Sequence, residues 1–155
     1  MPPERAIPLV EAGEREMLSA WLDFQRATLA VKCAGLTDDQ LRERAVPPSR
    51  LSLLGLIRHM AEVERVWFRP VLDGEPMSGL WSAGHALDPE SAFDDVGAAD
   101  VAAAFTAWRG ECEHATALAA AAASLDVTGV RGGALLAALG HGPHDRGVRP
   151  AQWSC

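Results

Sequence analysis

The sequence contains no tyrosine, only three cysteines in 155 residues, and fewer basic than acidic side chains. Cys33, Cys112 and Cys155 are an odd number without Cys-x-x-Cys spacing, which argues against a disulfide framework and against a thiolate zinc site. We therefore expect Cys33 and Cys112 to pack as small apolar residues rather than to act as nucleophiles. The net charge of −7 argues against a nucleic-acid binder, which needs a basic face to bind phosphates.

The chain also lacks a targeting segment and a long apolar run. Residues 1–16 contain no apolar h-region, and no later run is long enough to span a bilayer. Neither a glycine-rich phosphate loop nor a Gly-x-Ser-x-Gly or His-Glu-x-x-His motif is present. With 48% hydrophobic and 23% charged residues, the composition is that of an ordinary globular protein. We expect one domain over residues 1–155, located in the cytoplasm.

Apolar residues recur at intervals of three and four along three long segments, which predicts an all-α protein. Ser52 and Asp100 are suitable N-caps for the second and third of these helices. A short helix is expected after the capping-box sequence at 37–40. The long helices are predicted at residues 11–33, 52–72 and 100–124.

The remaining segments are expected to connect or flank these helices. Residues 1–10 hold three prolines and should form an extended arm. Residues 74–97 are rich in Gly, Pro, Ser and Asp and form a crossover too long for a tight hairpin. Trp81 and Phe93 are expected to tether this crossover to the helices.

His59 is the best-placed metal-ligand candidate. It lies one turn after Leu56 and one turn before Val63, so its imidazole should point inward among apolar neighbours. Such a histidine is either a core residue or a ligand that faces a cavity, and spacing alone favours the core residue. The opposite face of the same helix should be solvated, because it carries Arg58, Glu62 and Arg65.

Two further histidines are weaker candidates. His85, in the crossover, is a weak metal candidate. His114 falls near the polar side of the third long helix, and we expect it to be solvated rather than to bind a metal.

Residues 14–125 resemble the actinobacterial mini-circle branch of the DinB-like superfamily, most densely in the segment PPS…LSLLGLIRHMAEVERVWF. The resemblance extends to FDDVGAADVAAAFTAWRGEC. It implies a four-helix bundle with an up-down-down-up course and a long second connection, which the crossover at 74–97 fits.

The resemblance also implies a divalent metal, zinc or nickel, held by a histidine of the second helix and by two ligands one turn apart on the fourth. His59 matches the second-helix position. In relatives the metal activates a small thiol, such as mycothiol, for transfer to an electrophile or for isomerisation. A divalent cation keeps the thiol deprotonated at neutral pH, and the thiolate is the nucleophile.

The segment 128–155 departs from this pattern, because a fourth helix is expected there and the sequence HGPHDRGVRPAQWSC has no helical period. Relatives read like HMIEEYARHNGHA at this place. With suitable synonymous codons, dropping the first base of the His141 codon makes this tail read Thr-Ala-His-Met-Ile-Glu-Glu-Tyr-Ala-Arg-His-Asn-Gly-His. We therefore predict a frameshift near residues 128–134, natural or from sequencing, that truncates or removes the fourth helix. His141 and His144 would then be accidental, and Pro143 between them argues against a helical ligand pair.

Two functions follow as hypotheses. The first is a lineage of metal-dependent thiol transferases or isomerases, which we expect to be inactive in this chain because one ligand is too few for a catalytic site. The second is a non-catalytic helical binding or structural module. Without its fourth helix the chain should expose apolar stripes and self-associate, and related bundles often form homodimers.

Overall fold

The computed structural model describes residues 5–8, 11–76, 78–81, 91–127 and 129. The described part is all-α, as predicted, and contains no strand. None of its helices is long and apolar enough to cross a membrane. The elements in chain order are α1 (Glu14–Cys33), α2 (Asp38–Arg42), α3 (Leu53–Val66), the π-helix η1 (Trp67–Asp73), the 3₁₀-helix η2 (Ser91–Phe93) and α4 (Val101–Ala121).

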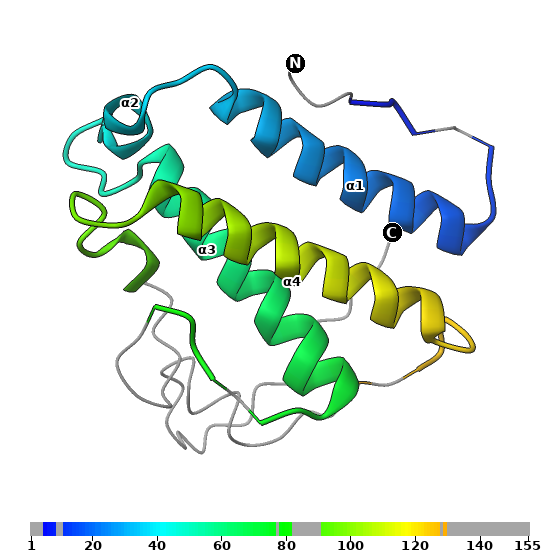
Figure 1. Cartoon of the computed structure of the whole chain (residues 1–155). Coiled ribbons are helices and arrows are strands. Elements are labelled where there is room, and N and C mark those ends of the chain that lie inside the picture. The colour runs from blue at the N-terminus through cyan, green and yellow to red at the C-terminus, as the bar shows by residue number, and fades with distance from the viewer. Residues whose placement is uncertain (1–4, 9–10, 77, 82–90, 128, 130–155) are drawn as a thin grey trace, which may run out of the picture.

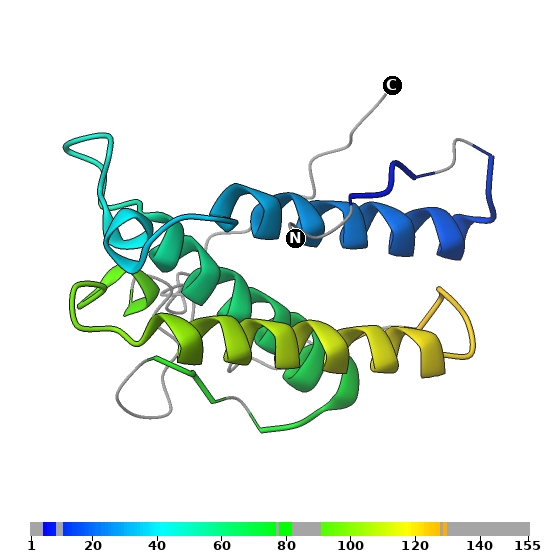
Figure 2. The same cartoon turned by 45° about the horizontal axis from the view of Figure 1, so that its top comes forward.

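The three long helices lie roughly along one direction (Figures 1 and 2). α3 and α4 run parallel and pack side by side, while α1 runs the opposite way. These are the first three directions of the expected up-down-down-up course. The predicted fourth helix and the aberrant tail fall on residues 128 and 130–155, outside the described residues.

The helix starts follow the predicted capping chemistry. The Thr37 side chain accepts from the backbone N–H of Gln40, and the Gln40 side chain accepts from the backbone N–H of Thr37, so the capping box is complete. Ser52 and Asp100 cap α3 and α4 by accepting backbone N–H bonds three residues ahead. Local sequence therefore fixes where these helices begin.

The end of the second long helix differs from the simple prediction of one α-helix. The α-helical pattern stops at Val66, and the chain continues as a π-helix through Asp73. Pro70 lies inside this stretch and has no N–H for the carbonyl four residues earlier, which favours a wider turn. Gly74, with φ of 73°, ends the helix in the left-handed region.

The core forms mainly between α3 and α4. Leu54, Ile57 and Ala61 of α3 are fully buried, and they pack with Ala104 and Trp108 of α4. Small residues on both helices allow their backbones to approach closely. Cys33 is buried in the same core, as predicted.

The prediction of a solvated face on α3 is wrong. Arg58 is 8% exposed and Glu62 is 2% exposed, because the crossover covers them. Trp81 donates its indole N–H to the Arg58 carbonyl, and the Arg58 guanidinium lies over the Trp81 ring and donates to the carbonyl of Asp94. Trp81 and Phe93 therefore tether the crossover as expected. Trp67 falls on the apolar period of this segment, yet it is 52% exposed.

The last turns of α1 pack Leu29, Ala30 and Cys33 on the core, but its first half reaches the other helices at polar points. Its apolar residues Leu18 and Trp21 remain 57% and 47% exposed. A groove of about 530 Å³ separates the first half of α1 from the second half of α4. Arg15 donates across this groove to the carbonyls of Ala119 and Ala122. The amphipathic face of α1 is thus incompletely covered by the described residues.

Candidate functional site

His59 lies in the middle of α3, partly buried. Its ring stacks on Phe93, with ring centroids 5.4 Å apart and an interplanar angle of 30°. Its Nδ1 atom is buried and finds no hydrogen-bond partner among the described residues. Buried histidine nitrogens normally have a partner, and this one has none among the described residues. It is therefore available to a hydrogen-bond donor or to a metal that those residues do not supply.

The described residues supply only this one ligand at His59. No group of three His, Cys, Asp or Glu donors within the described ranges includes it. His85, His141 and His144 lie outside those ranges. His59 therefore fits one position of a metal site, but the described residues do not complete that site.

A second set of donors was missed by the sequence analysis. The side chains of Asp73, Glu75 and His114 bring one ligand atom each within 4.8 Å of one another. His114 Nε2 lies 3.5 Å from Glu75 Oε1, and the His114 side chain is 30% exposed rather than fully solvated. The turn sequence around Gly74 was visible in the sequence. Its position beside His114 was not, because it depends on how α4 packs against the end of η1.

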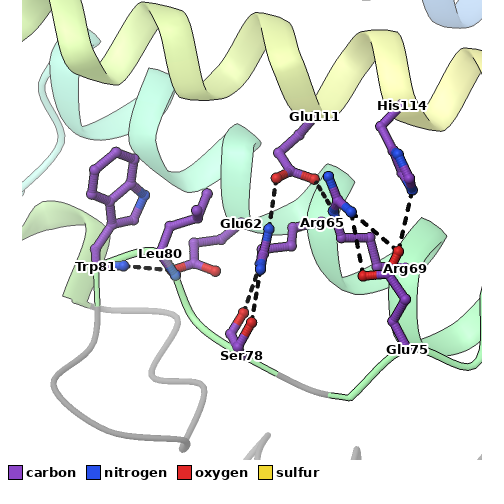
Figure 3. A network of polar contacts seen from close by, with 9 residues as sticks. All are labelled: Glu62, Arg65, Arg69, Glu75, Ser78, Leu80, Trp81, Glu111 and His114. Carbon is purple, nitrogen blue, oxygen red and sulfur yellow. Dashed lines mark hydrogen bonds and ion pairs between the residues drawn. The ribbon is translucent and has the colours of Figure 1, made fainter.

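Glu75 belongs to a chain of ion pairs that joins three segments (Figure 3). The Glu111 carboxylate of α4 accepts from Arg65 of α3 and from Arg69 of η1, both at 2.7 Å. Arg69 also reaches Glu75 at 3.1 Å, and Arg65 donates to the Ser78 carbonyl. The hydrogen bond to Glu111 raises the pKa of Arg69, so this guanidinium stays charged.

Glu62 fixes the start of the crossover on the same side of α3. Its Oε1 accepts from the backbone N–H groups of Leu80 and Trp81, at 2.7 and 3.0 Å. Figure 3 shows this carboxylate beside the Arg65 pair. The polar side chains of α3 are thus used to hold the crossover, which explains why they are buried.

The two described cysteines are poor nucleophiles, as predicted. Burial raises the pKa of the Cys33 thiol. The pKa of Cys112 is raised to about 12, mainly by burial and to a smaller extent by the charge of nearby Glu64. Since only the thiolate is reactive, neither thiol is activated.

Comparisons with known proteins give the family of the chain. Neither a search of curated proteins nor a search of solved structures found a match. The family model described as mycothiol-S-transferase matches residues 17–135, which is most of the chain and covers α3, α4 and all but the first turn of α1. The matched stretch contains His59 and confirms the expected relation to DinB-like, mycothiol-dependent proteins. This chain belongs to the mycothiol-S-transferase family.

Proposed function

We propose that this protein derives from a divalent-metal-dependent enzyme that transfers a small thiol of the mycothiol type to an electrophile, or uses it for isomerisation, with His59 as one metal ligand. The observation that carries the proposal is the unpartnered, buried Nδ1 of His59 within a mycothiol-S-transferase chain. Zinc or nickel would hold the thiol as its thiolate near neutral pH. The reducing conditions that such a thiol needs agree with the odd number of cysteines and with a cytoplasmic location.

We further propose that this chain is inactive because a frameshift replaces its last helix. The family match ends at residue 135, close to the predicted shift at 128–134. Gly129 lies against η1, where an added Cβ would lie 2.7 Å from Val71 Cγ1. In the restored frame, the Glu-x-x-x-His pair would supply the two missing ligands.

The second candidate function is a non-catalytic binding or structural module. It is supported by the single ligand at His59 in the described part. The exposed Leu18 and Trp21 of α1 support self-association, such as a homodimer. Size-exclusion chromatography tests this directly, and a soluble monomer with a sharp two-state melt would contradict it.

The deciding experiment compares this chain with a version restored to the alternative frame from about residue 131. Elemental analysis after gel filtration should find one more zinc or nickel ion per chain in the restored protein than in this one. His59→Ala in the restored protein should remove that extra ion. The restored protein should also consume mycothiol in the presence of an electrophile, while this chain should not. Equal metal content in both proteins would refute the metal site and favour the non-catalytic module.

Resequencing the genomic region tests the frameshift separately. The nucleotide string should encode the Glu-x-x-x-His helix in the shifted frame. A string that cannot yield that helix would overturn the frameshift explanation, whatever the metal content.

A further inference from the structure

We infer that Asp73, Glu75 and His114 form a second divalent-cation site, separate from His59, that links the end of η1 to α4. The three residues come from two segments that lie about forty positions apart in the sequence but side by side in the fold (Figure 3 shows Glu75 and His114). Nothing in the proposed thiol chemistry uses them.

The spacing of the donors suits one small cation. Zinc binds histidine nitrogen and carboxylate oxygen at about 2.0–2.2 Å, so two donors on one tetrahedral ion lie about 3.4 Å apart. His114 Nε2 and Glu75 Oε1 are already 3.5 Å apart. All three ligand atoms lie within 4.8 Å of one another, and the exposed Asp73 side chain has room to rotate inward.

The state of His114 points to a missing ligand. Its Nε2 atom is buried and makes no hydrogen bond, although a carboxylate oxygen lies 3.5 Å away. A bound cation would satisfy the orphan nitrogen and the carboxylate together.

The local charge also favours a cation. Three carboxylates, those of Asp73, Glu75 and Glu111, face only two guanidinium groups, so the network is one negative charge in excess. Arg69 donates from Nη1 to both oxygens of Glu75, at 3.1 and 3.3 Å, and from Nε to Glu111 at 2.7 Å, so a cation would share Glu75 with this guanidinium.

The turn between the two carboxylates is already formed. Gly74 adopts φ of 73°, and the N–H of Glu75 donates to the Arg69 carbonyl at 3.1 Å. This geometry sets Asp73 and Glu75 on the same side as His114 without further ordering of the backbone. One nitrogen and two carboxylate donors, with positions left for water, favour zinc, cobalt or nickel over magnesium and calcium.

Isothermal titration of this chain carrying His59→Ala with zinc chloride tests the site without any contribution from the proposed thiol centre. We expect one zinc per chain in this variant and a higher melting temperature when zinc is present. Adding His114→Ala should weaken zinc binding at least tenfold, and Asp73→Asn, at an exposed position that folding does not need, should weaken it several-fold. Glu113→Gln is the matched control, because it removes an exposed carboxylate next to His114 on the same helix and should change nothing.

The inference is overturned if the His59→Ala variant takes up no zinc at millimolar concentration, or if Asp73→Asn and His114→Ala bind as tightly as their parent. If His59→Ala itself abolishes zinc binding to this chain, the cation belongs to the His59 centre and the second site does not exist. Loss of the second site would leave the comparison with the frame-restored protein unaffected.

Discussion

Replacing Arg26 with alanine should lower the free energy of unfolding by about 3–5 kcal/mol, because it leaves a buried carboxylate without its partner. Arg26 of α1 makes two hydrogen bonds to Glu64 of α3, Nε to Oε1 at 2.8 Å and Nη2 to Oε2 at 2.7 Å. The two side chains are 11% and 3% exposed. Burial by itself would lower the pKa of Arg26, but the hydrogen bond and charge of Glu64 raise it, so the guanidinium stays charged.

The magnitude follows from how α1 is held. The apolar residues Leu18 and Trp21 leave much of their surface in water, so the Arg26 pair carries an unusual share of the attachment of this helix. A domain of this size has about 5–15 kcal/mol of stability in total, so the loss is a large fraction of it. We expect α1 to detach before the α3–α4 pair unfolds.

Urea denaturation followed by circular dichroism measures the loss, and hydrogen exchange of α1 amides reports the local detachment. Asp23→Ala is the matched control, since Asp23 contacts the same guanidinium at 3.2 Å but is 65% exposed, and it should cost about 0–1 kcal/mol. The double variant Arg26→Met with Glu64→Leu should recover much of the loss, because no charge is then left buried. A cost below about 1 kcal/mol for Arg26→Ala, equal to that of the control, would refute the reasoning.

Four smaller predictions concern α3 and α4. Gly55→Ala should destabilise the protein by about 1–3 kcal/mol, because the added Cβ would lie 2.6 Å from Phe93 Cδ1. Gly110→Ala, in open space on α4, should instead stabilise it by up to about 1 kcal/mol. Thermal melts compare the two variants. Ser52→Ala should cost about 1 kcal/mol in the same assay, because it removes the N-cap of α3. Cys112 should react with iodoacetamide at pH 8 at least about tenfold more slowly than a thiol with a pKa of 9.0, since its own is about 12 and the gain in nucleophilicity offsets only part of the lost thiolate. Because this pKa is raised on folding, the stability that Cys112 contributes should be complete below pH 9 and be lost as the pH rises toward 12; equal loss in Cys112→Ala would show that another group is responsible.

The sequence by itself determined the elements of this fold, because their signals are local. The apolar period placed the three long helices, and Thr37, Ser52 and Asp100 cap their helices as predicted. The relation to a mycothiol-dependent, DinB-like family was also confirmed, since the family model covers residues 17–135. Helix periods and N-caps involve residues only three or four positions apart, so both can be recognised in the sequence itself.

Only the tertiary structure decided which polar side chains are buried and which donors meet. The periodicity predicted that Arg58 and Glu62 are exposed to solvent. In the structure the crossover covers both side chains and forms hydrogen bonds with them, so this polar face is buried. His114 comes close to Glu75 because α4 runs parallel to α3 beside the end of η1. Contacts between distant segments depend on how helices pack, and one helix's own periodicity carries no information about its neighbours.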